Sequence, residues 1–202
     1  MDAVICHYDQ LIDEENDPVR DPQILKEYMD GWDGQRFIDS LQLDMNKSVL
    51  EIGVGTGRLA VRTAPACRSL CGIDISPKTV QRAIDNLSCC PNVTLICGDF
   101  LSFEFRETFD VIYSSLTFMH IKDTASAIRK VSSLLNADGL FVLSIDKNRE
   151  DFIEMPTRRI RIYPDSPEDI RDCLSVSELS LAEQFETDHA YVVVSRKASS
   201  AS

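Results

Sequence analysis

The sequence predicts an α/β fold of three layers, in which helices cover both faces of a mostly parallel, doubly wound sheet. Between residues 48 and 146, segments with the pattern of buried strands alternate with segments of helical periodicity. Strands that are separated by helices in this way pair in parallel. Near the carboxyl end, residues 180–197 form two strand-like segments around a tight turn at Asp188 and His189. Hairpin strands are antiparallel, so we expect the sheet to end with one reversed strand.

Local signals support each element in turn. Strands are expected over residues 48–53, 69–76, 92–99, 109–115 and 140–146. Helices between and after them are expected over residues 58–66, 76–87, 125–135 and 166–174. Ser76 is placed to cap the second of these helices, and Pro77 suits its first turn. Ser166 and Asp169 have the spacing of a capping box at the start of the last helix.

The segment before the first strand is expected to form a helical cap over residues 1–44. Its first part, residues 1–20, is polar and acidic and carries few structural signals. A helix is expected to begin at Asp21, which can cap it, with Pro22 in the first turn. Two apolar helical faces follow, and their residues are Ile24, Leu25, Tyr28, Met29, Phe37, Ile38 and Leu41. We expect one domain over residues 1–198, with its core over 45–198, and a disordered tail at 199–202.

The composition is that of an ordinary globular chain, with 44% hydrophobic and 27% charged residues. It has no apolar run of roughly 18 residues and no basic-then-apolar leader, so we expect no membrane span, no signal peptide and a cytoplasmic location. The net charge of -12 disfavours general binding to nucleic acid, because phosphate backbones are repelled. The basic run at residues 158–161 is expected to be the exposed face of a strand, with contact to an anionic group as the alternative.

The seven cysteines are odd in number, and no C-x-x-C pair is present. The three histidines are scattered, so we expect no zinc site. Three of the cysteines, Cys67, Cys71 and Cys97, lie in or beside apolar stretches, where a reduced thiol behaves as a small hydrophobic group. Cys89 and Cys90 are adjacent, which indicates a loop of free thiols, with attraction of a soft metalloid as the alternative.

A glycine-rich loop follows the first strand, in the stretch VLEIGVGTGRLA that covers residues 49–60. Parallel sheets of this kind bind ligands at the carboxyl ends of their strands. A dinucleotide loop requires the pattern G-x-G-x-x-G/A. Counted from Gly53, the third glycine position is Arg58, whose side chain obstructs close packing; counted from Gly55, it is Ala60. The first glycine of the pattern should follow the strand directly, which favours the Gly53 register. In that register the third glycine position holds Arg58, so the sequence does not match the dinucleotide pattern.

Acidic residues stand beside this loop and at the ends of the next two strands. Glu51 precedes the loop, Asp74 ends the second strand, and Asp99 ends the third, with Phe100 beside it as an apolar neighbour for an adenine. A carboxylate in the position of Asp74 accepts hydrogen bonds from a ribose diol. Three carboxylates around one crevice would repel a pyrophosphate. They suit a ligand that carries an amino group, a ribose and a positive centre.

The ordered stretches VLEIGVGTG, CGIDIS, ICGDF, FDVIYSS and LLNADGLFVLSI resemble the motifs of a class I S-adenosylmethionine-dependent methyltransferase, from about residue 45 to residue 147. The resemblance implies a seven-stranded sheet whose last strand is antiparallel. It also implies that the backbone of Gly53, Gly55 and Gly57 contacts the methionine part of the cofactor. Asp74 would then bind the ribose hydroxyls and Asp99 the adenine amino group, with Ile75 and Phe100 beside the ring and Ser114 near the methyl donor. The product would be S-adenosylhomocysteine.

His120, which follows the fourth strand, is the candidate general base, since similar small-molecule methyltransferases carry a histidine at this place. Its alternative is a packing or loop-bonding role. Phe118 and Met119 are candidates for the wall of an acceptor pocket. Tyr8 is a candidate cofactor contact, because in similar enzymes the segment that also contains His7 and Trp32 folds over the cofactor as a lid.

We expect a small-molecule acceptor and a monomer or homodimer. The Asn-Pro-Pro-Tyr motif of many amino-group methylators is absent, and the insert over residues 146–180 is too short to grip a protein. An anionic acceptor would point to Arg158 and Arg159. Two rival hypotheses stay open: an NAD-dependent oxidoreductase that uses the Gly55 register, and an S-adenosylmethionine-binding protein without catalysis.

Overall fold

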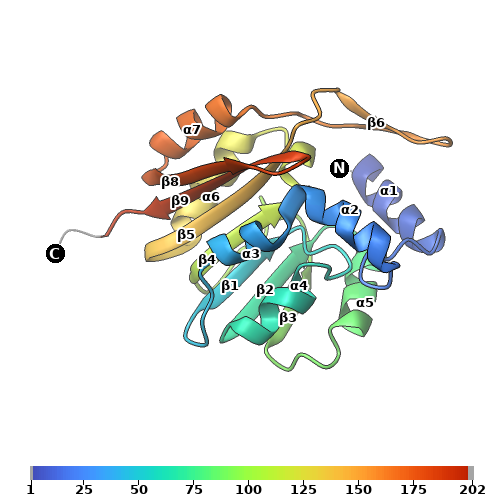
Figure 1. The fold of residues 1–202 in the computed structure, drawn as a ribbon, viewed down its shortest axis with the longest axis horizontal. Helices are drawn as coiled ribbons and strands as arrows, with labels where there is room; N and C mark the ends of the chain where they lie inside the picture. Colours follow the sequence, from blue (N-terminus) through green and yellow to red (C-terminus); the bar gives the residue numbers. More distant parts are fainter. Residues whose placement is uncertain (1, 200–202) are drawn as a thin grey trace.

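The computed structural model describes residues 2–199, so most of the tail expected at 199–202 lies outside the described residues. The chain forms one seven-stranded sheet with the order β3-β2-β1-β4-β5-β9-β8 (Figure 1). Its strands are β1 (Ser48–Ile52), β2 (Ser69–Asp74), β3 (Val93–Cys97), β4 (Phe109–Ser115), β5 (Leu135–Asp146), β8 (Leu179–Glu186) and β9 (Ala190–Lys197). The strands from β3 to β5 pair in parallel, and β9 is antiparallel to both of its neighbours. The predicted sheet with a reversed last strand is confirmed.

Helices cover both faces of the sheet, as the alternation of elements predicts. One face packs against α6 (Thr124–Leu134) and α7 (Pro167–Ser175), with Ile128 and Ile170 fully buried in that core. The other face packs against α3 (Gln35–Ser40), α4 (Ala60–Thr63) and α5 (Pro77–Asn86), where Phe37 and Ala83 are fully buried. Short 3-10 turns, η1 (Ala64–Ala66) and η2 (Phe118–His120), follow α4 and β4. No helix among residues 2–199 is long and apolar enough to cross a membrane.

The helix caps that the sequence predicts are present. The Ser76 side chain accepts a hydrogen bond from the backbone N–H of Thr79 at the start of α5. Ser166 and Asp169 form the reciprocal capping box of α7. These local signals set the first residues of α5 and α7. The segments before them, β2 and the loop after β7, therefore end at Ser76 and Ser166 at the latest.

The cap region is helical, as predicted for residues 1–44, but its local signals do not give its details. Residues Asp2–Asp13 form a helix, α1, although the sequence shows few signals there. The helix α2 (Gln23–Asp33) begins at Pro22 without a side-chain cap, so the expected capping role of Asp21 is wrong.

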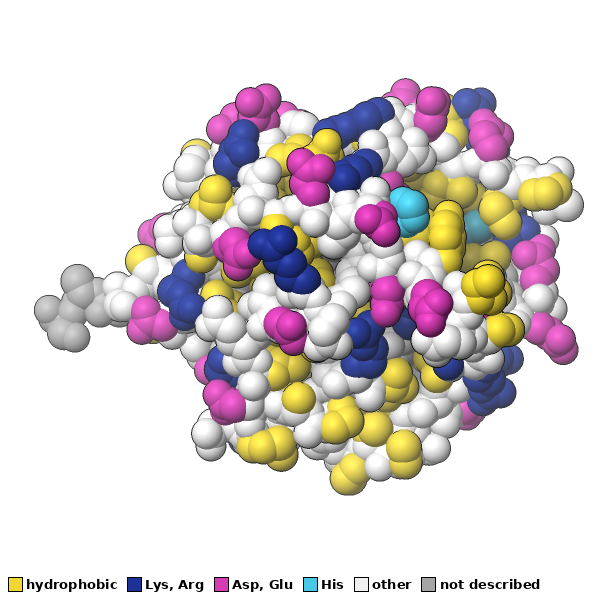
Figure 2. All heavy atoms as spheres, in the orientation of Figure 1, with side chains coloured by type: hydrophobic (Ala, Val, Ile, Leu, Met, Phe, Trp, Pro, Cys, Tyr) yellow, Lys and Arg dark blue, Asp and Glu magenta, His cyan; other side chains and the backbone are white. Residues whose placement is uncertain are grey.

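The apolar face that the sequence predicts for α2 is also wrong. Ile24, Leu25 and Tyr28 are 75%, 46% and 57% exposed, and hydrophobic side chains stand at the surface of this side of the molecule (Figure 2). The helix instead buries Gly31 and Asp33. Gly31 lies against the His189 ring, and the Asp33 carboxylate accepts a hydrogen bond from the Arg58 guanidinium. A small residue and an ion pair therefore decide which side of α2 faces the sheet.

A second, two-stranded sheet of β6 (Phe152–Glu154) and β7 (Arg159–Arg161) lies in the insert after β5 and extends beyond the main sheet toward α1 (Figure 1). Arg159 and Arg161 are exposed on β7, while Ile160 between them is buried. The basic run therefore supplies the exposed face of a strand, as the sequence favours.

Candidate functional site

The glycine loop after β1 has a backbone that only glycine adopts readily. Gly53, Gly55 and Gly57 have φ angles of +77°, +56° and +94°. A Cβ atom on Gly53 would collide with the Thr117 side chain, which follows β4. A Cβ atom on Gly55 would meet no heavy atom within 4 Å. The loop is thus closed at Gly53 and open at Gly55, where space remains for a ligand to approach the backbone.

Asp74, at the carboxyl end of β2, is fixed beside this opening. One of its carboxylate oxygens accepts a hydrogen bond of 3.0 Å from the Gly55 N–H, and the other accepts one of 3.0 Å from the Ser76 N–H. Burial raises the pKa of the Asp74 carboxyl above its ordinary value, although the backbone donors act in the other direction. Each oxygen keeps a lone pair for a further donor.

His120 and Tyr8 meet on the same side of the crevice, from chain positions 112 residues apart. The Tyr8 hydroxyl lies 2.8 Å from Nε2 of His120, and the two rings are edge to face. Burial lowers the pKa of His120 to about 4, and His7 adds to this, so the imidazole is neutral at physiological pH. Burial raises the pKa of Tyr8, and the nearby Asp74 carboxylate raises it further, which keeps the phenol protonated. Within the described part of the chain, the buried Nδ1 atom of His120 has no hydrogen-bond partner.

Glu51 lies beneath the loop rather than in the open part of the crevice. It is 3% exposed, and its Oε2 atom accepts a hydrogen bond of 2.8 Å from the Tyr113 hydroxyl. Burial raises the pKa of the Glu51 carboxyl to about 8, against the opposing effects of Tyr113 and Arg58. At neutral pH the carboxyl is therefore mostly protonated, and it adds little negative charge to the crevice.

A buried ion pair that sequence reasoning missed joins the cap to the loop. Asp33 at the end of α2 is fully buried and accepts two hydrogen bonds from the Arg58 guanidinium, one of them 2.7 Å long. The Ser115 hydroxyl at the end of β4 donates to the same carboxylate. One feature of the sequence indicated this ion pair. Arg58 stands where a dinucleotide loop carries glycine, and a long cationic side chain close to the sheet needs an anionic partner.

The remaining predicted cofactor contacts lie at the same edge of the sheet. The Asp99 carboxylate accepts hydrogen bonds from the Ser102 hydroxyl at 2.8 Å and from backbone N–H groups of the turn after β3. Ile75 follows Asp74 and is half-buried. Phe100 is 6% exposed and packs in the core against Phe105. The Ser114 hydroxyl is fully buried and donates to the Ile52 carbonyl, so it ties β4 to β1.

Helix α1 covers the crevice and is held from both sides. The Asp9 carboxylate accepts a hydrogen bond of 2.7 Å from the Ser76 hydroxyl at the start of α5. From the β6–β7 side, Arg158 pairs with Glu14 at 2.7 Å and donates to Nδ1 of His7 at 2.8 Å. Arg158 is therefore already neutralised within the fold.

Arg159 is engaged as well, since it pairs with Glu154 at 2.7 Å and lies over the Phe152 ring. Neither of the two arginines that the sequence suggested for an anionic acceptor is left without an anionic partner.

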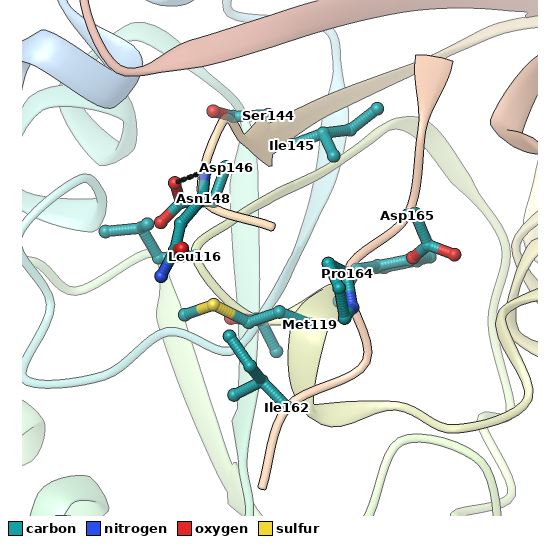
Figure 3. Close-up of a pocket in the computed structure, with 11 residues that line it drawn as sticks. Leu116, Met119, Ser144, Ile145, Asp146, Asn148, Ile162, Pro164 and Asp165 are labelled. Carbon is teal, nitrogen blue, oxygen red and sulfur yellow. Dashed lines mark hydrogen bonds between the residues drawn. The ribbon is translucent and has the colours of Figure 1, made fainter. Parts of the chain in front are cut away.

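A small pocket opens between the segment after β4, the end of β5 and the segment after β7 (Figure 3). Phe118 and Met119 line it together with residues that the sequence did not indicate, which are Leu116, Thr117, Ser144, Ile145, Asp146, Asn148, Ile162, Pro164 and Asp165. Asp146 accepts hydrogen bonds from the Trp32 indole N–H and from the backbone of Asn148. The lining contains carboxylates but no lysine, arginine or histidine.

Comparison with known proteins agrees with this geometry. Residues 49–139 match the model of a methyltransferase domain family. An uncharacterized methyltransferase of Bacillus cytotoxicus is 40% identical over 105 residues, which is 50% of this chain and 49% of the relative. The chain thus spans about half the length of the curated relatives it matches.

Solved structures extend the similarity over nearly the whole chain at the level of the fold. Magnesium protoporphyrin IX methyltransferase from Synechocystis PCC 6803, with bound SAM, superposes with a TM-score of 0.74 at 20% identity and covers 96% of this chain and 95% of its own. An S-adenosylmethionine dependent methyltransferase from Mesorhizobium loti superposes with a TM-score of 0.68 at 17% identity, over 82% of this chain and 97% of its own. The sheet order and the matched residues confirm the resemblance at the level of the fold: residues 49–139 match a methyltransferase domain family, and the chain has the Rossmann-like fold of these solved methyltransferases.

Proposed function

We propose that the protein transfers a methyl group from S-adenosylmethionine to a small-molecule acceptor. The family match and the fold support methyl transfer in general. The observation that carries the proposal for this chain is the crevice itself, because the open backbone at Gly55 faces a fixed carboxylate, Asp74, and a Tyr8–His120 pair. An NAD-dependent oxidoreductase is less well supported, since the third glycine position of the better register holds Arg58 in its ion pair with Asp33.

The residues of the crevice fit a nucleoside with a positive sulfur centre. The Gly53, Gly55 and Gly57 backbone would hold the methionine part, and the free lone pairs of Asp74 would accept the ribose hydroxyls. Asp99 would accept from the adenine amino group, with Ile75 and Phe100 beside the ring. The sulfonium supplies a methyl group that is already activated for displacement.

The chain's own contribution to the reaction is orientation and proton removal. Holding an acceptor in line with a reactive carbon is worth roughly 7–11 kcal/mol of the barrier. We assign His120 the role of general base, because the imidazole is neutral and its buried Nδ1 is unpartnered in the described structure. The Tyr8 hydroxyl fixes the ring through Nε2. Helix α1 keeps water out of the crevice.

The pocket that contains Met119, the residue before His120, is the candidate place for the acceptor. Its free volume is about 10 Å³, so it has to widen when an acceptor binds, and this favours a small molecule over a polymer. Apolar side chains such as Met119 and Ile162 form one side, and Asp146 and Asn148 form a polar end. We expect the acceptor to carry no negative charge, because the lining contains Asp146 and Asp165 and no basic side chain.

Isothermal titration calorimetry of the full chain with S-adenosylmethionine, S-adenosylhomocysteine and NAD tests the cofactor. We expect both sulfur ligands to bind and NAD not to bind. In the Asp74→Ala variant, affinity should fall by about 1.5–3 kcal/mol, because hydrogen bonds to a charged group are lost. Asp85→Ala, an exposed aspartate on α5, is the matched control. Binding of NAD, or an unchanged dissociation constant in Asp74→Ala, would contradict the proposal.

Catalysis is tested separately by screening apolar amines, phenols and thiols for acceptor-dependent release of S-adenosylhomocysteine. His120→Ala should lose this release while it retains cofactor binding. Cofactor binding without release for any acceptor would favour the rival hypothesis of a binding protein without catalysis.

A further inference from the structure

Two cysteine side chains on the surface, outside the crevice, form a pair with defined geometry. Cys89 and Cys90 follow α5, and their sulfur atoms lie 3.9 Å apart as free thiols. Cys89 is exposed and Cys90 is half-buried against the core. The pair is therefore accessible from solvent on one side and supported by packing on the other.

The loop that carries the pair is fixed at both ends. The Cys90 N–H donates to the Leu87 carbonyl at 2.8 Å, and the Val93 N–H donates to the Cys90 carbonyl at 3.2 Å. The Asn92 side chain donates to the carbonyls of Ala64 and Cys67. A loop held in this way presents both sulfurs without further ordering, which lowers the entropic cost of binding a ligand between them.

The spacing disfavours a bond between the sulfurs. Consecutive Cα atoms are about 3.8 Å apart across a trans peptide, which is less than the roughly 4.4–6.8 Å that disulfides span. The 3.9 Å separation is ordinary contact between two thiols, so one bridging atom can bond both sulfurs after a small rotation of the exposed Cys89 side chain. Among the described residues, no third histidine, cysteine or carboxylate completes a metal-binding group here.

We propose that Cys89 and Cys90 form a two-thiolate site for trivalent arsenicals. With phenylarsine oxide, both S–H bonds break, two As–S bonds form, and the oxygen leaves as water with both protons. Arsenic stays trivalent, so no oxidant or reductant is needed.

The test uses the full chain, reduced with a phosphine, and one equivalent of phenylarsine oxide. Intact-mass spectrometry should show one adduct per chain, and proteolysis should place it on the peptide with Cys89 and Cys90. Cys89→Ser, which changes an exposed side chain, and Cys90→Ser should each weaken binding at least tenfold. Cys6→Ser and Cys97→Ser, which remove other exposed thiols, should leave it unchanged.

Competition then separates a chelate from single-thiol chemistry. The wild-type adduct should survive an excess of 2-mercaptoethanol and be removed by 2,3-dimercaptopropanol, whereas any Cys89→Ser adduct should be lost to the monothiol. Equal retention in wild type and Cys89→Ser, or an adduct that maps to another cysteine, would overturn the site. Neither measurement needs S-adenosylmethionine, so the result stands apart from the proposed function.

Discussion

Glu51 should make the stability of the protein depend on pH in a direction that is unusual for a carboxylate. Burial beneath the glycine loop raises its pKa from the ordinary 4.5 to about 8. A group whose folded pKa is raised binds its proton more tightly in the folded state. Its contribution to stability is therefore complete below about pH 4.5 and is lost as the pH rises through 8.

The size of the effect follows from linkage. One unit of pKa difference is about 1.4 kcal/mol, so between pH 5 and pH 8 the folded state loses on the order of 1 kcal/mol per pH unit through this residue. The cost arises because a charged carboxylate at a 3% exposed position has only the Tyr113 hydroxyl and the more distant Arg58 to stabilise it. Glutamine keeps an oxygen that accepts from Tyr113 and carries no titrating proton.

The assay is urea unfolding of wild type and Glu51→Gln at several pH values between 5 and 8. We expect the stability difference to grow with pH in favour of the variant. Glu104→Gln, at an exposed position, is the control and should run parallel to wild type. A wild-type minus Glu51→Gln difference that stays constant over this range would refute the reasoning.

Three further substitutions test the crevice and its cover. Gly55→Ala meets no atom but must adopt a φ of +56°, so we expect about 1–2 kcal/mol of destabilisation in urea and, by calorimetry, weaker binding of S-adenosylmethionine. Tyr8→Phe removes the hydroxyl at His120, and we expect turnover to fall roughly 10²-fold with cofactor affinity little changed, once an acceptor is known. Arg158→Ala breaks the contact between β7 and α1, so cofactor release measured by stopped flow should accelerate. Arg159→Ala, whose ion pair stays within the hairpin, should not change it.

The central part of the fold could be predicted because its signals are local. Strand 48–53 differs from the observed β1 by one residue, and Ser76 and Ser166 mark helix starts by hydrogen bonds to residues three positions away. The nearly continuous hydrophobic runs of β1 and β4 indicate burial on both faces, as a central parallel strand requires. The order of Gly53, Asp74 and Asp99 then follows from the right-handed connections of such a sheet.

The cap could not be predicted in the same way, because its placement depends on partners far away in the sequence. The periodicity of α2 identified a helix but assigned the wrong face, since Ile24 and Tyr28 are exposed while Asp33 is buried against Arg58. Helix α1 is located by Arg158, which is 144 residues from its partner Glu14. Pattern alone carries no information about such pairs.

The parts that were missed are those that complete the site. The ion pair of Asp33 and Arg58 ties α2 to the glycine loop, and the Ser115 hydroxyl ties both to the end of β4. On the other side of the crevice, Tyr8 reaches His120 only because α1 is held between α5 and β7. The motifs of the sheet therefore specify where a cofactor is held, while the surroundings of His120 depend on the cap. Proteins that share the glycine loop and Asp74 but differ in the cap should consequently share a cofactor and differ in the acceptor.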